Sequence, residues 1–241
     1  MPRFFINGAP GDIYALQGED FIHLSKSLRM QCGELLTLCN GKGLDFICSV
    51  QSIEPQQAIL KVLETQPNKA EPDIKVTLFQ CLPKGDKLDT VIQKAVELGV
   101  FELVPVISSR VISRPDAKAL DKKRQRWQKV ALEAAKQSGR GIVPQIKECL
   151  SLKEMCKQLP SFEQALFCYE KGGAPVKSVL EEEKPHALAV IIGPEGGFAP
   201  EEAELIQSSG GTAVTLGTRI LRTETAPLAV LSIIMYQTGN I

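Results

Sequence analysis

The sequence has few histidines, and its cysteines lack the spacings typical of metal centres and disulfide frameworks. It contains two histidines, His23 and His186, in 241 residues, so a site with several histidine ligands is excluded. A histidine-dependent catalytic triad is disfavoured for the same reason. The seven cysteines are an odd number and form no C-x-x-C pair, so neither a disulfide framework nor a zinc ribbon is indicated. We therefore expect a protein without a metal, whose chemistry relies on other side chains.

Long hydrophobic runs are also missing. The longest apolar stretch, 226–236, is too short and too interrupted to span a bilayer. The opening residues lack the apolar centre of a signal peptide. We expect a cytoplasmic protein with no membrane partner. Hydrophobic residues make up 44% of the chain, which is enough for a sizeable core in one or two domains.

The formal net charge of zero conceals an uneven distribution. Residues 108–147 contain eleven Lys and Arg against three Asp and Glu, a net charge of +8. Residues 148–204 carry a net charge of −6. The basic stretch could form a face suited to a phosphate backbone. A solvated helix with a lysine-rich exterior explains it equally well.

Two regions differ in their patterns. Residues 1–70 alternate short β-rich runs with turn signals, including the hairpin signal 40–43, and predict a small β-barrel. A helix-like insert at 21–30 carries Lys26 and Arg29, which with Arg3 and Lys42 could form a modest nucleic-acid surface. The polar segment 66–73 reads as a linker.

From residue 74, strands alternate with helices, which indicates an α/β domain with crossover helices. The expected helices are 86–98, 116–138, 151–159, 175–183, 200–208 and 228–236.

Two glycine-marked turns lie near the end of the chain. Residues 193–198 follow the apolar run 189–192, and residues 217–226 follow the strand-like run 212–216. Glycines let a ligand approach the backbone closely. A P-loop would need a Gly-Lys-Ser/Thr ending, and the dinucleotide spacing is missing. Since Glu195 also places a carboxylate in the first turn, an uncharged or cationic ligand fits better than a phosphate. Two ordinary tight turns remain the alternative.

The amino-acid sequence of these turns resembles that of a known family. Ile192-Gly-Pro-Glu-Gly-Gly-Phe198, followed by Leu216-Gly-Thr-Arg-Ile-Leu-Arg-Thr-Glu-Thr-Ala226, is similar to the signature of the SPOUT-class RNA methyltransferases, and more narrowly of the RsmE family. The blocks 93–100, 109–110 and 137–140 are similar too. The resemblance implies methylation of N3 of a uridine in the decoding region of 16S ribosomal RNA. It also implies an S-adenosylmethionine cofactor, a trefoil-knotted, mainly parallel sheet at 74–241, a PUA-like barrel at 1–70, and a homodimer.

The resemblance also assigns residues to roles. The reaction itself needs a base or a cation that stabilises a uracil anion, and the catalytic candidates are Arg222, to stabilise the anion, and Glu224, to accept a proton or merely to cap a helix. Arg110 or Arg140 could be offered from the basic segment of the same or the other subunit. Three loops would bind the cofactor through Cys168, Tyr169, Glu170, Ile192, Gly193, Pro194, Glu195, Gly196, Gly197, Leu216, Gly217, Ile220 and Leu221. The expected RNA contacts are Arg3, Lys26, Arg29, Lys84, Arg110 and Arg140, on free RNA or on the assembled small subunit.

Two other classes of protein remain open. A Rossmann enzyme would explain the α/β alternation, but its glycine fingerprint should follow the first strand, where the turn at 82–85 has only Gly85. A non-catalytic RNA-binding protein would explain the barrel and the basic helix. It would have no use for the two glycine turns, so binding of S-adenosylmethionine discriminates between these readings.

Overall fold

The computed structural model describes residues 1–112, 114–181 and 185–241. The internal contacts divide the chain into two units. Unit 1 comprises residues 1–71 and 135–143, and unit 2 comprises residues 72–134 and 144–241. The sequence analysis placed the first boundary between residues 70 and 74 but assigned all of 135–143 to the second domain. The last residues of the expected helix 175–183 lie outside the described residues.

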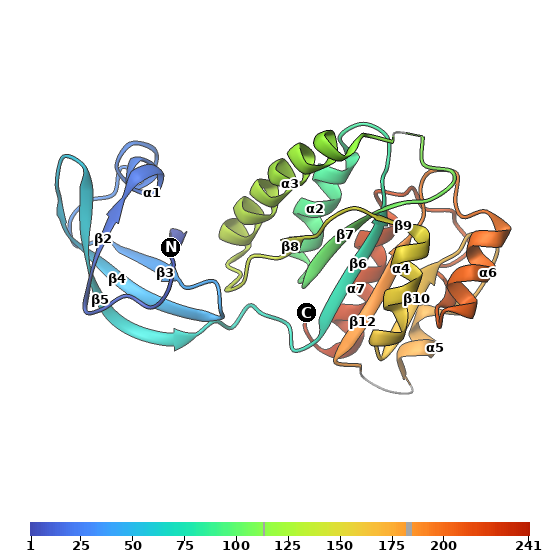
Figure 1. Cartoon of the computed structure of the whole chain (residues 1–241). Helices are drawn as coiled ribbons and strands as arrows, with labels where there is room; N and C mark the ends of the chain where they lie inside the picture. Colours follow the sequence, from blue (N-terminus) through green and yellow to red (C-terminus); the bar gives the residue numbers. More distant parts are fainter. Residues whose placement is uncertain (113, 182–184) are drawn as a thin grey trace. The chain divides into compact units, whose positions relative to one another are not determined.

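Unit 1 is built on a five-stranded sheet in the order β1-β3-β4-β5-β2, and Figure 1 shows that it is curled. Only the β1–β3 pair is parallel; the other pairs are antiparallel. The Asn40 side chain accepts the Lys42 and Leu44 N–H groups at 2.8 and 3.1 Å, which closes the expected hairpin between β3 and β4. The strands are β1 (Arg3–Phe5), β2 (Ile13–Gln17), β3 (Leu35–Cys39), β4 (Leu44–Ile53) and β5 (Gln57–Pro67).

The helical insert of unit 1 begins and ends three residues earlier than the expected helix 21–30. It consists of α1 (Gly18–Ile22) and the π-helical turn η1 (His23–Ser27). Leu24 is fully buried and anchors the insert on the sheet. The helix cannot reach residue 30, because Arg29 adopts a left-handed backbone with φ 52°. Lys26 and Arg29 are both exposed.

The returning segment 135–143 is bound to unit 1 by a buried ion pair. Arg140, which is 2% exposed, donates two hydrogen bonds to the Glu71 carboxylate, from Nε at 2.9 Å and from one terminal nitrogen at 2.7 Å. Glu71 Oε1 also accepts the N–H groups of Gly141 and Ile142 at 2.8 and 3.0 Å. One carboxylate therefore fixes the whole turn that follows the basic helix.

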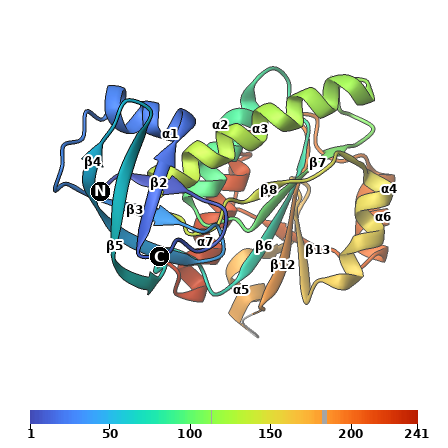
Figure 2. The same ribbon diagram turned by 60° about the vertical axis from the view of Figure 1, so that its left-hand side comes forward.

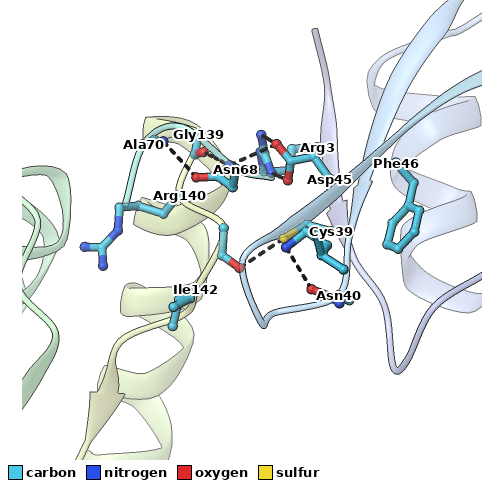
Figure 3. A network of polar contacts seen from close by, with 12 residues as sticks. Arg3, Cys39, Asn40, Asp45, Phe46, Asn68, Ala70, Gly139, Arg140 and Ile142 are labelled. Carbon is cyan, nitrogen blue, oxygen red and sulfur yellow. Dashed lines mark hydrogen bonds and ion pairs between the residues drawn. The ribbon is translucent and has the colours of Figure 1, made fainter. Parts of the chain in front are cut away.

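A second polar network joins the same segment to the sheet (Figure 3). Arg3 forms a two-pronged ion pair with Asp45, with N···O distances of 2.5 and 2.8 Å. The Asn68 amide donates to Asp45 Oδ2 at 2.9 Å and to the Gly139 carbonyl at 3.0 Å. The Cys39 thiol donates to the Gly141 carbonyl at 3.1 Å. The pKa of the Asp45 carboxyl is lowered: burial opposes ionisation, but the hydrogen bonds from Arg3 and Asn68 outweigh it.

Unit 2 contains a parallel sheet of eight strands in the order β11-β13-β10-β12-β6-β7-β8, with β9 paired to β7. The central strands β6, β12 and β10 are almost wholly buried, as expected for strands covered on both faces. The expected α/β class with a mainly parallel sheet is confirmed. The strands are β6 (Lys75–Cys81), β7 (Glu102–Ile107), β8 (Gln145–Ile146), β9 (Leu150–Ser151), β10 (Gln164–Cys168), β11 (Ala174–Pro175), β12 (Ala187–Ile192) and β13 (Thr212–Thr215).

Helices cover both faces of this sheet. Figures 1 and 2 show α4 (Leu152–Gln158) and α6 (Pro200–Ser208) on one face, and α2 (Lys87–Glu97), α5 (Val176–Glu181) and α7 (Ala226–Thr238) on the other. A short 3₁₀ turn, η2 (Leu159–Ser161), follows α4. The basic helix α3 (Ala117–Ser138) reaches α2 through Trp127, whose indole nitrogen donates to Asp89 at 3.0 Å. Trp127 is 4% exposed, so it packs against protein and does not offer a stacking face.

Candidate active site

The two glycine-rich turns meet at one edge of the unit 2 sheet. Strands β13, β10 and β12 are neighbours and parallel, so the loops that follow Thr215, Cys168 and Ile192 leave from the same edge. These loops enclose a pocket of about 560 Å³. That volume is within the usual range for small-molecule sites, and every residue assigned to cofactor binding or catalysis lines it.

The backbone conformation of the first turn favours glycine. Gly197 has φ 65°, and its N–H donates to the Pro194 carbonyl at 2.9 Å. A Cβ on Gly197 would overlap the Glu170 carboxylate, lying 2.8 Å from its Cδ. Phe198 is fully buried and anchors the end of the turn. The turn is thus fixed while its backbone stays open toward the pocket.

Helix α6 starts without a Ser or Thr at its cap position. Ala199 stands at the cap position, and the Glu202 carboxylate accepts its N–H at 3.0 Å. The same carboxylate accepts the Ser109 N–H at 2.6 Å. Arg110 then donates to the Gly196 carbonyl at 2.7 Å. Residues 109–110 therefore support the first turn from outside.

A buried chain of hydrogen bonds joins the two turns. The Thr223 hydroxyl donates to the Gly193 carbonyl at 2.7 Å and accepts from Gln80 Nε2 at 3.1 Å. Gln80 is fully buried, and Thr223 is 6% exposed. The sequence analysis overlooked Gln80, although a polar residue in the apolar strand 75–81 was a usable signal.

A charged cluster also spans the turns. The Lys87 ammonium, at the start of α2, lies 3.3 Å from Glu195 Oε1 and 3.2 Å from Glu224 Oε2. Hydrogen bonds and charge from Glu224 and Glu195 raise the pKa of Lys87. The pKa of each carboxyl is lowered, because Lys87 and backbone N–H groups outweigh the effect of burial. All three groups are therefore charged near neutral pH, and Glu224 is a weak proton acceptor. Lys87 was not among the predicted site residues.

The residues assigned to RNA have different environments. Lys84 and Arg110 are exposed near the first turn. Lys26 and Arg29 are exposed in unit 1. Two further arginines were expected to be available and are not: Arg140 is buried against Glu71, and the Arg3 side chain is 11% exposed and paired with Asp45. Their guanidinium groups hold unit 1 together, and we withdraw both from the RNA surface.

Within residues 1–112, 114–181 and 185–241, no group of three or more His, Cys, Asp or Glu side chains is arranged to hold a metal ion. In the same ranges, no helix is both long enough and apolar enough to cross a bilayer.

Comparison with known proteins gives matches over both units. Residues 70–235 match the model of the RNA methyltransferase domain, and residues 16–63 match the RNA methyltransferase PUA domain. The chain is 35% identical to ribosomal RNA small subunit methyltransferase E of Bacillus subtilis (strain 168), over 99% of this chain and 97% of that protein.

Solved structures agree with these matches. A ribosomal RNA small subunit methyltransferase E from Neisseria gonorrhoeae, bound to S-adenosyl methionine, superposes with a TM-score of 0.87 at 31% identity, covering 98% of this chain and 97% of that one. The putative methyltransferase Lpg2936 from Legionella pneumophila, in complex with the same cofactor, gives a TM-score of 0.86 at 30% identity, covering 97% and 96%.

Proposed function

The chain belongs to the ribosomal RNA small subunit methyltransferase E family, and on that premise we propose that it methylates N3 of a uridine in the decoding region of 16S ribosomal RNA, with S-adenosylmethionine as methyl donor. The observation that carries the proposal is the single pocket of about 560 Å³ formed by both glycine-rich turns. A protein that only bound RNA would have no need of it.

The pocket suits this cofactor chemically. Its glycine backbone at 193 and 196–197 allows close approach by a flat adenine or a ribose. The carboxylates of Glu170, Glu195 and Glu224 line the wall and complement a cation better than a phosphate. The bound cofactor would supply a methyl group on a positively charged sulfur. The backbone of 168–170 and 216–221 would position it.

The reaction forms a bond from N3 to the methyl carbon, breaks the bond from carbon to sulfur, and releases the N3 proton. N3 of uridine is protonated at neutral pH, so the protein must stabilise the uracil anion or remove the proton. Arg222 is exposed on the pocket wall, and its guanidinium has the donors to bind a developing O2 or O4 anion. The low pKa of Glu224 favours the anion-stabilising role of Arg222 over proton removal by Glu224.

RNA would be held by exposed cations on both units. Lys84 and Arg110 lie beside the first turn, and Lys26 and Arg29 lie on the insert of unit 1. Such contacts to phosphates would make binding sensitive to salt. The match of residues 16–63 to an RNA methyltransferase PUA domain supports a role for unit 1 in RNA binding.

Family membership also supports three finer features that we include in the proposal: a trefoil knot in unit 2, a homodimer, and a cytoplasmic location where ribosomal RNA is available. A groove lined by Leu98, Leu228 and Ala229 between α2 and α7, together with Tyr236 at 75% exposure, supports an association surface on that face. Light scattering of the purified protein tests the dimer: a monomer mass at micromolar concentration would contradict it.

The activity is tested with methyl-labelled S-adenosylmethionine and two substrates, free 16S RNA and small subunits that lack the modification. We expect label in the RNA and a reverse-transcription stop at one decoding-region uridine, because N3 methylation blocks base pairing. Label on another base or on ribose would contradict the proposed N3 position. If calorimetry showed no binding of S-adenosylmethionine, the proposed methyltransferase activity would be contradicted.

A further inference from the structure

Lys87 occupies a position between the two turns that no sequence motif indicated. Its ammonium lies 3.3 Å from Glu195 and 3.2 Å from Glu224, so it bridges a carboxylate from each turn. The Lys84 N–H also donates to Glu195 at 3.0 Å. The start of α2 therefore determines where both carboxylates lie.

The cluster of Glu195, Lys87 and Glu224 carries a net charge of −1. The side chains are 30%, 34% and 24% exposed, so they are partly shielded from water and interact more strongly with a bound charge than fully exposed groups would. The remaining charged residues that line the pocket are Glu170, Arg219 and Arg222. Removing Lys87 makes the wall more negative by one charge, whatever these three contribute.

The proposed reaction changes the charge of the ligand in this pocket. S-adenosylmethionine carries one more positive charge than S-adenosylhomocysteine, because transfer of the methyl group converts a sulfonium into a neutral thioether. A negative wall therefore binds the methyl donor more tightly than the product, relative to an uncharged wall.

We propose that Lys87 is a positioning residue that sets the charge of the cofactor pocket, and thereby the ratio of its affinities for S-adenosylmethionine and S-adenosylhomocysteine. This inference rests on the proposed function. By offsetting one of two carboxylates, Lys87 limits the preference for the donor. It also holds Glu195 and Glu224 in place. Both roles follow from the same two ion pairs, but they predict different results when Lys87 is removed.

The test is calorimetry of the full chain with each ligand separately. Lys87→Met should raise the ratio of the product Kd to the donor Kd by about threefold to tenfold, which corresponds to one charge acting across a partly shielded distance. Glu195→Gln should lower the ratio by a similar factor. Lys87→Arg should leave the ratio near that of the wild type. Lys153→Met, which removes an exposed ammonium from α4, controls for the change in total charge.

The double variant Lys87→Met with Glu195→Gln separates charge from positioning. It restores the local charge of −1 without the bridge, so its ratio should return to the wild-type value even if both affinities fall. If Lys87→Met weakens both ligands equally and leaves the ratio unchanged, Lys87 only holds the turns and the inference is wrong. If the wild type binds neither ligand, the proposed function itself fails.

Discussion

The two units use charged residues in opposite ways. In unit 1, Arg140 is 2% exposed and is held by both oxygens of Glu71, and Arg3 is held in the same two-pronged manner by Asp45. In the pocket of unit 2, one lysine is shared by two partly exposed carboxylates, and Arg222 is exposed. The first arrangement satisfies its charges within the protein, whereas the second leaves charge available to a ligand.

This difference shows that an arginine within a sequence motif is not always available to bind a ligand. Arg140 and Arg222 both lie in blocks that resemble the family pattern, yet only Arg222 lines the pocket. A buried charge requires a partner at close range. A buried arginine is therefore paired with a carboxylate of the protein and cannot bind a ligand. Exposure and pairing, which the sequence does not display, separate Arg140, which is buried in an ion pair, from Arg222, which is exposed on the pocket wall.

The largest expected effect of breaking the contrast between the two units is that of Arg140→Ala in unit 1. Removing Arg140 from this ion pair should destabilise unit 1 by about 3–5 kcal/mol, because the largely shielded Glu71 carboxylate, whose side chain is 16% exposed, loses its charged partner. Hydrogen exchange should show lost protection across residues 1–71, while the cofactor affinity of unit 2 stays near the wild-type value. Lys69→Ala, an exposed cation in unit 1, should change neither quantity. Unaltered exchange in Arg140→Ala would show that the ion pair is not needed for stability.

Arg222→Ala should lower the activity and leave the stability of the protein unchanged. We expect methyl transfer to fall by at least about 100-fold, since a group that stabilises developing negative charge is worth that much in other enzymes. Calorimetry should give a cofactor Kd within about twofold of the wild type, because water and salt screen the exposed Arg222 charge more than the partly shielded Lys87 charge, and hydrogen exchange should not change. Arg222→Lys, which keeps the charge but not the planar donors, should recover part of the activity. Full turnover by Arg222→Ala would exclude Arg222 from catalysis.

Substitutions at two glycines, Gly197 in the pocket wall and Gly210 outside it, compare the effects on ligand binding and on stability. Gly197→Ala should weaken S-adenosylmethionine binding by about tenfold, because alanine disfavours φ 65° and its methyl group would displace Glu170. Gly210→Ala is the matched control: it has φ 99°, nothing within 4 Å of its Cβ, and no place in the pocket wall. It should lose stability without losing cofactor affinity. Equal Kd values for both variants would refute the steric argument.

The smallest expected effect is a dependence of unit 1 stability on pH. The folded-state pKa of Asp45 is lowered, so its ion pair contributes stability above the unfolded-state pKa, which is about 3.9. That contribution is lost as the pH falls through the lower, folded-state pKa. The stability difference between wild type and Asp45→Asn, measured by hydrogen exchange or denaturant titration, should therefore shrink below about pH 4. A difference that stays constant from pH 6 to pH 3 would contradict this assignment.

Much of the fold could be predicted because local patterns and the core agree. The apolar run at 189–192 lies in the central strand β12, and Asn40 formed the expected hairpin turn. The wall of the pocket followed from the glycine turns, since parallel strands bring their carboxyl ends to one edge. The roles of Lys87, Gln80 and Glu71 could not be predicted, because each depends on a partner more than 60 residues away in the chain. Spacing along a sequence does not reveal such pairs.

The return of residues 135–143 to unit 1 has a consequence for modular engineering. A fragment cut after Glu71 would retain that carboxylate but lose Arg140, Gly141 and Ile142, the groups that satisfy it. The amino-terminal module is therefore discontinuous, and grafting it onto another enzyme would require transplanting two separated stretches of chain. Recombination at the linker 66–73 would yield a module whose Glu71 carboxylate has lost these hydrogen-bond partners.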